Sequence, residues 1–220
     1  MIITIDGPAG AGKSTVAKEL AQRLGFRFLD TGAMYRAVAL AGMNRGLDWD
    51  RPDDLARLAE KVALRLEGNR VLLDGEDVTE AVRASAVTAV TRYAADNPQV
   101  RHRLVALQRE LAAGDNVVTE GRDQGTVAFP HAELKIFLTA SPVERAKRRL
   151  GDLETKGERV TLDEVLAAQE RRDREDAARP VGPLTPAADA VTVGTDGMTL
   201  DEVVERLEAL ARERMTKAEN

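Results

Sequence analysis

The sequence predicts an α/β fold in which short apolar strands alternate with amphipathic helices. Three observations lead to this fold class. A β-branched run at residues 2–5 stands directly before a glycine-rich loop and a helical pattern. Further strand-like runs follow, each separated from the next by helical segments. With 220 residues, the chain is also long enough to bury a substantial core in one large domain or in one domain with insertions.

The glycine-rich loop fits the pattern G-x-x-x-x-G-K-[ST] from Gly7 to Ser14. Glycine permits positive φ and close approach of the backbone to a ligand. Lys13 is expected to reach the β- and γ-phosphates of a nucleotide, and the Ser14 hydroxyl is expected to ligate Mg²⁺. The predicted nucleotide-binding residues are Gly7, Pro8, Ala9, Gly10, Ala11, Gly12, Lys13, Ser14 and Thr15.

The flanking segments make a chance glycine turn a poor explanation of this loop. Ile3 and Ile5 belong to the preceding apolar strand, while Val16 and Leu20 recur at helical spacing after the loop. A phosphate on the loop therefore lies at a helix N-terminus, where free N–H groups and the helix dipole favour anions.

A second strand is predicted at residues 26–30, and a helix follows it to about Gly46. Thr31 is expected to cap this helix, and Arg36 lies in its second turn. For both residues a purely structural role and a ligand-binding role remain open.

Residues 52–95 differ from the βα pattern around them. A short helix at 52–61 precedes two alternating runs at 64–67 and 70–73, which a Gly-Asn pair separates. This arrangement is typical of a β-hairpin and predicts a small inserted subdomain.

The segment Asp96-Asn97-Pro98 predicts the start of a helix at about 99–113. Arg101 lies in its first turn, where a cation opposes the helix dipole. An anionic or hydrogen-bonding partner for Arg101 is therefore expected.

A strand at 116–120 ends in the segment Gly121-Arg-Asp-Gln-Gly-Thr126. In an open α/β sheet, ligands bind beyond the carboxyl ends of the strands. Arg122 and Asp123 follow one such end, as do the glycine-rich loop and the pair Asp30-Thr31. We therefore expect these three strand ends to contribute to one ligand site.

A further strand at 134–138 precedes a helix from Pro142, on which Arg145 and Arg149 share a face. A polar stretch at 151–159 is expected to break that helix, and the next helix is expected at 161–178. Arg172 and Arg179 are seven residues apart and face the same way. A solvated pair of helices laced with salt bridges is the alternative interpretation. A strand at 190–193 and a helix from Thr199 complete the pattern.

Composition limits the remaining function classes. The chain has no Cys and only two His, which excludes disulfides, thiolate zinc sites and cysteine nucleophiles. Its net charge of −5 argues against a nucleic-acid partner. No apolar run approaches the roughly 18 residues of a membrane span, and no signal-peptide pattern begins the chain, so a cytoplasmic protein without a membrane partner is expected.

Six segments in this order and spacing resemble the bacterial cytidylate kinase family over nearly the whole chain. They are 5–14, 30–36, 98–101, 121–126, 135–138 and 144–145. The first is shared by all P-loop kinases, whereas the combination is far more specific.

The resemblance implies a P-loop NTPase fold with a five-stranded parallel sheet flanked by helices. One kinase domain, 1–220, is expected to comprise a core (1–50, 96–147, 166–220), a monophosphate-binding insert (51–95) and a short mobile lid (148–165). The implied reaction transfers the γ-phosphoryl group of ATP, with Mg²⁺, to CMP or dCMP. A monomer is expected.

The resemblance also assigns roles to individual side chains. The positions matching Thr31, Arg36, Arg122 and Arg179 hold the acceptor phosphate. Those matching Arg101 and Asp123 contact cytosine, and those matching Arg172 and Asp176 lie at the sugar. Lys13, Arg145 and Arg149 are implied to act on the transferred phosphoryl group. The resemblance thus assigns the substrate-binding residues Thr31, Arg36, Arg101, Arg122, Asp123, Arg172, Asp176 and Arg179.

One departure from the family pattern concerns the base. Arg92 stands where the family usually has a Ser that helps to hold cytosine, and Thr91 is a possible substitute. Two alternative functions remain open: another small P-loop kinase, acting on UMP or a non-nucleotide acceptor, and a nucleotide-dependent switch.

Overall fold

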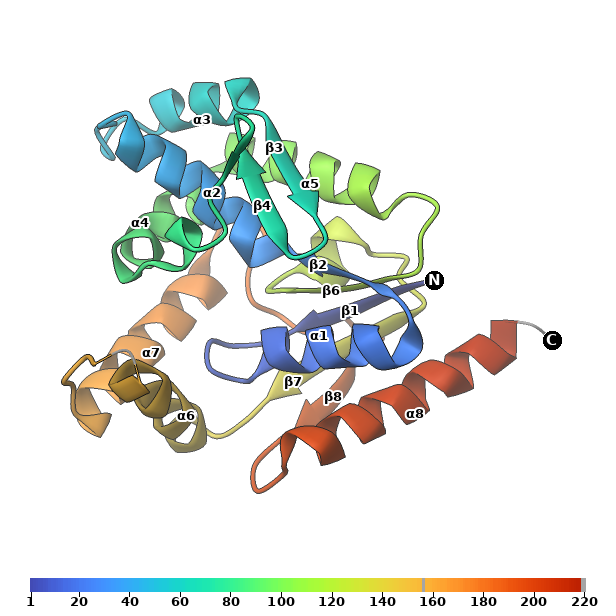
Figure 1. Ribbon diagram of the computed structural model, residues 1–220. Coiled ribbons are helices and arrows are strands. Elements are labelled where there is room, and N and C mark those ends of the chain that lie inside the picture. The colour runs from blue at the N-terminus through green and yellow to red at the C-terminus, as the bar shows by residue number, and fades with distance from the viewer. Residues whose placement is uncertain (156, 219–220) are drawn as a thin grey trace. The chain divides into compact units, whose positions relative to one another are not determined.

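The computed structural model describes residues 1–155 and 157–218, and the chain divides into two compact units (Figure 1). Unit 1 consists of Met1–Phe28 together with the chain from Gly114 onward. Unit 2 is Leu29–Ala113. The glycine-rich loop therefore belongs to unit 1, and the predicted insert at 51–95 lies wholly within unit 2.

Unit 1 is built on a five-stranded parallel sheet with the order β2-β6-β1-β7-β8. Its strands are β1 Ile2–Asp6, β2 Arg27–Asp30 (which continues into unit 2), β6 Val117–Gly121, β7 Leu134–Thr139 and β8 Val191–Gly194. In the register, Asp6 lies opposite Gly121 on one side and Phe137 on the other. The loops that follow β1 and β6 consequently leave the same edge of the sheet.

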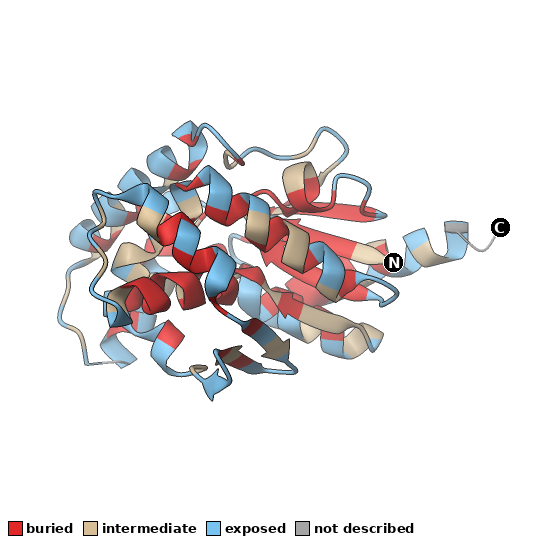
Figure 2. Cartoon of the chain, turned by 90° about the horizontal axis from the view of Figure 1, so that it is seen from above, coloured by how far each residue is buried: buried red, intermediate tan, exposed pale blue. Residues whose placement is uncertain are grey.

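Four α-helices and one π-helical turn accompany this sheet. They are α1 Lys13–Leu24, η2 Gln124–Ala128, α6 Pro142–Thr155, α7 Leu162–Ala178 and α8 Leu200–Ala218. The centre of the sheet is fully buried, and Ile3 and Ile5 of β1 are 0% exposed. The buried parts of the central strands are red in Figure 2. They pack against Leu20 of α1 and Leu207 of α8, which forms the core that fixes the loop ends.

Each predicted strand of unit 1 is confirmed to within one or two residues. The predicted break at 151–159 is wrong in its starting point, because α6 continues through Gly151 to Thr155. Leu153 of this last turn packs with Val165 of α7 in a small hydrophobic cluster. Glycine in an exposed helix costs only about 1 kcal/mol, which such packing outweighs.

Unit 2 combines helices with a three-stranded antiparallel sheet of order β3-β4-β5. Its elements are α2 Thr31–Asn44, α3 Pro52–Lys61, β3 Leu64–Glu67, β4 Arg70–Leu73, β5 Glu76–Asp77, η1 Ala81–Arg83, α4 Ser85–Asp96 and α5 Pro98–Ala112. One continuous core joins them, in which Met34 and Val38 of α2 and Val82 are fully buried.

The predicted helix at 52–61 and the hairpin are confirmed, as is the Asn97 cap, whose side chain accepts hydrogen bonds from the Gln99 and Val100 amides. The predicted Thr31 cap is wrong. Asp30 is the N-cap instead, and its carboxylate accepts from the Ala33 amide at 2.8 Å. Helix α4 and strand β5 were not predicted. In the part of the chain that the structure describes, no helix is long and apolar enough to span a membrane.

Candidate active site

The glycine-rich loop leaves β1 at the carboxyl edge of the sheet and ends at helix α1. Gly7 has φ 151°, and a Cβ atom built on it would lie 2.0 Å from the carbonyl oxygen of Leu138. No side chain fits there, so glycine is required for the loop to pass β7. The predicted loop therefore has the expected context of a strand, a tight turn and a helix.

The N-terminus of α1 is open to an anion. Its N-cap is Gly12, in the left-handed conformation, and no described side chain caps the first turn or places a carboxylate in it. The first backbone N–H groups of a helix need acceptors from outside the helix, and the dipole favours a negative one. Loop and helix together thus have the geometry of a phosphate-binding cradle.

Lys13 lies at the centre of this cradle and is 6% exposed. Its Nζ donates to the carbonyl oxygen of Pro8 at 2.8 Å. Burial and the neighbouring positive charge of Arg122 lower the pKa of Lys13 from 10.5 to about 7, although Glu120 opposes the shift. A bound anion would favour the charged form of Lys13 and raise its pKa toward the usual value.

Two acidic side chains stand at the strand ends beside the cradle. Ser14 Oγ donates to the Glu120 carboxylate at 3.1 Å, so the predicted metal ligand has a second oxygen donor next to it. Asp6 is 4% exposed and accepts from the amides of Gln124 at 2.9 Å and Gly125 at 2.7 Å. Burial raises the pKa of Asp6 to about 6, against those two hydrogen bonds.

Three predicted substrate-binding residues of unit 1 meet in one ion-pair network. The carboxylate of Asp176 pairs with Arg122 Nε at 2.8 Å and with Arg179 Nη2 at 2.6 Å. Burial raises the pKa of Asp176, but the two guanidinium groups outweigh it and hold that pKa below its usual value. Arg179 is the C-cap of α7, outside the helix as the following proline predicts.

Arg172 and Asp123 lie near the same network. The charge of Arg172 lowers the pKa of both Lys13 and Asp176, which places its guanidinium within electrostatic reach of each. Asp123 is 4% exposed and begins the π-helical turn η2, where its backbone carbonyl accepts from Val127 and Ala128. Its charge contributes to the raised pKa of Asp6, so the two carboxylates are neighbours.

The two predicted arginines of α6 occupy different environments. Arg145 is 5% exposed and contacts the glycine-rich loop, because its Nη1 donates to the carbonyl oxygen of Ala9 at 2.8 Å. Arg149 is half-buried and forms no hydrogen bond or ion pair with the described residues. Arg148, which was not predicted, bonds Thr195 and has its Nη1 3.9 Å from a Cβ built on Gly12.

The predicted residues of unit 2 form two local clusters. In the first, the Asp30 carboxylate that caps α2 also pairs with Arg36 Nη2 at 3.3 Å. The Nε atom of Arg36 is buried and has no hydrogen-bond partner in the described chain. Thr31 is 2% exposed in the first turn of the same helix. A half-buried guanidinium with an unused donor is equipped to bind an anion.

In the second cluster, Arg101 is 3% exposed and donates from Nη1 to the carbonyl oxygen of Ala95 at 3.1 Å. Its guanidinium lies 5.6 Å from the centre of the Tyr35 ring. A backbone carbonyl is thus one hydrogen-bonding partner of Arg101. Nearby in sequence, Thr91 Oγ1 donates to Val87, while Arg92 is exposed and stacks on Tyr93 at 4.8 Å.

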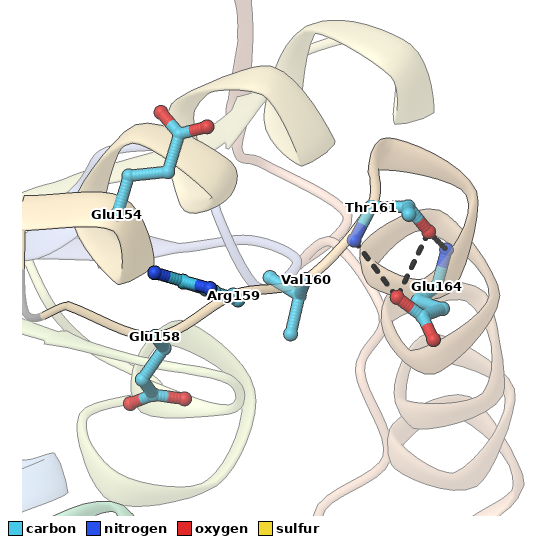
Figure 3. A pocket seen from close by; sticks show the side chains of 6 residues that line it. All are labelled: Glu154, Glu158, Arg159, Val160, Thr161 and Glu164. Carbon is cyan, nitrogen blue, oxygen red and sulfur yellow. Dashed lines mark hydrogen bonds between the residues drawn. The ribbon is translucent and has the colours of Figure 1, made fainter.

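A pocket at the connection between α6 and α7 lies in the predicted lid segment and is a poor phosphate site. Figure 3 shows its lining residues, Glu154, Glu158, Arg159, Val160, Thr161 and Glu164. Three of them are carboxylates, and Thr161 and Glu164 form the reciprocal capping box that begins α7. No group of three His, Cys, Asp or Glu side chains in the described residues is arranged to hold a metal.

Sequence reasoning missed several residues of this site. Asp6 and Glu120 lie at the carboxyl ends of strands, and this position could have identified both as candidate site residues. Arg148 and Asp173 lie in helices where acidic and basic residues are nearly balanced, so their sequence positions gave no signal. The residues missed are Asp6, Glu120, Arg148 and Asp173.

A phosphate-binding loop between β1 and α1 of a parallel sheet, with buried guanidinium groups beside it, defines a P-loop phosphotransferase. Comparison with known proteins shows which family of this class the chain belongs to. The chain belongs to the cytidylate kinase family, whose model matches residues 3–213, and it is thus a nucleoside monophosphate kinase.

Relatives of the chain support the same family. It is 53% identical over 213 residues to a cytidylate kinase of Rhodopirellula baltica, with 97% of this chain and 93% of the relative covered. It is 51% identical to a cytidylate kinase of Pelotomaculum thermopropionicum, with 94% of each chain covered. The crystal structure of shikimate kinase from Bacteroides thetaiotaomicron is similar in fold, with a TM-score of 0.51, 16% identity and coverage of 96% and 98%.

Proposed function

We propose that this protein transfers the γ-phosphoryl group of ATP to the phosphate of CMP or dCMP, forming CDP or dCDP and ADP. The observation that carries the proposal is the cationic cradle of unit 1. It combines the uncapped α1 N-terminus, the buried Lys13 and the paired guanidinium groups of Arg122 and Arg179. These hydrogen-bond donors and positive charges would stabilise the negative charge where the phosphates of the two nucleotides approach each other.

On the donor side, the amides of residues 7–15 and Lys13 are assigned to the phosphates of ATP. The Ser14 hydroxyl and the Glu120 carboxylate are hard oxygen donors side by side. They fit Mg²⁺, which takes one or two protein oxygens and completes its shell with water and phosphate oxygens. When bound, Mg²⁺ would neutralise part of the triphosphate charge.

On the acceptor side, we assign Arg122, Arg179, Thr31 and Arg36 to the monophosphate, and Arg172 and Asp176 to the sugar and its surroundings. In the unliganded protein, Asp176 holds Arg122 and Arg179 in place. The acceptor is already an anion, so the reaction needs no catalytic base. Its demands are positioning and charge stabilisation, which these side chains supply.

For base selection we assign Asp123 and Arg101. Cytosine presents an N4 amino donor where uracil presents a carbonyl oxygen, so a carboxylate accepts from the former and repels the latter. An edge contact of this kind discriminates by roughly 1–3 kcal/mol. The assignment therefore favours CMP over UMP.

Arg145 and Arg149 are assigned to the charge that grows on the transferred phosphoryl group. We further propose that residues 148–165 close as a lid, which would exclude water and limit hydrolysis of ATP. The protein is proposed to act as a monomer, which light scattering after size exclusion would test.

The decisive experiment is a coupled assay of ADP formation with CMP, dCMP, UMP or AMP, and with no acceptor. We expect rapid ADP formation with CMP and dCMP and little without an acceptor. Lys13→Ala should abolish transfer while circular dichroism still reports a folded chain. Turnover that does not depend on an acceptor would instead favour a nucleotide-dependent switch, and preference for UMP would favour another small kinase.

A further inference from the structure

Helix α7 contacts the phosphate-binding loop through a residue that the proposed function leaves without a role. The carboxylate of Asp173 pairs with Arg145 Nη1 at 2.7 Å. Its other oxygen accepts from the backbone amide of Ala9, in the loop, at 3.4 Å. Asp173 thus joins three segments of unit 1: the loop, α6 and α7.

Arg145 is held on several sides by this arrangement. Its Nε donates to the carbonyl oxygen of Ala140 at 3.1 Å, and its Nη1 donates to that of Ala9 at 2.8 Å. Asp173 is its one ion-pair partner in the described part of the chain. The Nη2 nitrogen forms no hydrogen bond to a described protein group, so one face of a fixed guanidinium remains for a ligand.

The loop has little room to shift at this point. A Cβ atom built on Gly10 would lie 3.0 Å from the carbonyl oxygen of Arg145 and 3.1 Å from Oε1 of Gln169. Gln169 is one turn before Asp173 on α7 and is 6% exposed. The tip of the loop therefore packs against both helices, and Asp173 supplies the charged contact in this packing.

We infer that Asp173 is a positioning residue for the phosphoryl donor. It orients the Arg145 guanidinium and the Ala9 amide together, so that both are in place when a nucleoside triphosphate binds the loop. This inference rests on the proposed function. On this inference α7 positions groups for both substrates, because Asp176, one turn after Asp173, pairs with the arginines assigned to the acceptor.

Burial separates this pair from the ordinary ion pairs of the same helix. Arg145 and Asp173 have side-chain exposures of 6% and 21%, whereas Arg174 and Glu170 are 72% and 49% exposed and 4.0 Å apart. A buried guanidinium that loses its carboxylate stays uncompensated, while an exposed pair contributes little. Glu170→Gln is therefore a matched control for Asp173→Asn.

The test measures the Kd of ATP by calorimetry without acceptor, and the KM of ATP and of CMP in the full-length enzyme. For Asp173→Asn we expect weaker ATP binding and a loss in kcat/KM for ATP of between about tenfold and a hundredfold. The KM of CMP and all constants of Glu170→Gln should stay within about twofold. An equal change in both KM values, or none, would overturn the inference.

A double-mutant cycle asks whether Asp173 acts through Arg145. In an Arg145→Gln background, Asp173→Asn should cost little further kcat/KM for ATP, because the shared guanidinium is already gone. Full additivity would refute the positioning role. If Asp173→Asn does not fold, Asp173→Glu keeps the charge but displaces it, and an unchanged Kd of ATP in that variant would count against the inference. Failure of the wild-type enzyme to phosphorylate CMP would instead reject the proposed function.

Discussion

The low pKa of Lys13 makes a quantitative prediction about nucleotide binding. Burial and Arg122 lower that pKa from 10.5 to about 7. Each tenfold change in acidity corresponds to about 1.4 kcal/mol, so a charged Lys13 costs the unliganded protein about 5 kcal/mol. A triphosphate beside Nζ favours the charged form and raises the pKa again.

Binding of ATP should therefore take up a proton at alkaline pH. With a pKa of about 7, Lys13 in the free protein is about nine-tenths neutral at pH 8 and mostly charged at pH 6. We expect ATP binding to take up a large part of one proton at pH 8 and much less at pH 6, and we expect the affinity for ATP to fall as pH rises above about 7.

Calorimetry in two buffers with different ionisation enthalpies measures this uptake directly. Lys13→Arg is the control, because its guanidinium stays charged throughout and should take up no proton. Equal proton uptake by both proteins at pH 8, or none in the wild type, would refute the account of a neutral Lys13. The same shift has a consequence for stability. The unfolded chain binds the extra proton between pH 7 and 10.5, so this residue's contribution to stability rises with pH across that window.

Three further predictions concern the acceptor side. Asp176→Asn leaves Arg122 and Arg179 uncompensated, and we expect a loss of about 3–5 kcal/mol, seen as a lower Tm by calorimetry. In the wild type, the pKa of Asp176 is lowered, so its contribution to folding stability is present above the usual pKa of an aspartate and is lost as pH falls through the lowered pKa. If the variant and the wild type lost stability equally in acid, this account of Asp176 would be contradicted. Asp123→Ala should lower kcat/KM for CMP much more than for UMP, and an equal loss would remove Asp123 from base selection. Arg92 offers only donors and stacks on Tyr93, so Arg92→Ser should raise the preference for CMP over UMP by about two- to tenfold; an unchanged ratio of kcat/KM would exclude a role in selection.

Local chemistry made much of the fold predictable from the sequence. The glycine-rich loop, the hairpin at 64–73 and the Asn97 cap each depend on residues close together in the chain, and each is confirmed. Asp30 and Thr31 are both good capping residues, so position alone did not decide between them. The structure favours Asp30, whose carboxylate serves Ala33 and Arg36 at once.

Two other differences between prediction and structure, at α4 and α6, result from packing between segments. The N-cap of helix α4 is Ala84, which offers no capping side chain, and the helix contains several β-branched residues. Its Val87 and Ala94 are buried in the core of unit 2, which stabilises a helix that its own sequence signals weakly. In the same way, α6 passes Gly151 because Leu153 packs on Val165.

The helix at 162–178 shows where sequence reasoning reached its limit at the site. Acidic and basic residues are nearly balanced over 145–179, and a solvated pair of helices laced with salt bridges was the alternative interpretation. The structure separates only some of the predicted site residues from the solvated charges by burial. Asp176 and Arg179 are buried, whereas the predicted Arg172 is exposed, like Arg171 and Arg174. Burial is a property of the folded surroundings, so no spacing rule along the helix supplies it.

The electrostatics of unit 1 link the stability of the protein to its proposed binding of phosphate. Burial and the charges of Arg122 and Arg172 lower the pKa of Lys13, and the same two arginines hold the pKa of Asp176 below its usual value. Burial and repulsion both disfavour the charged form of Lys13, and we expect a bound phosphate to favour it. The cost in stability and the affinity for phosphate therefore have the same physical origin, as expected where a binding site departs from the rules that govern the rest of the core.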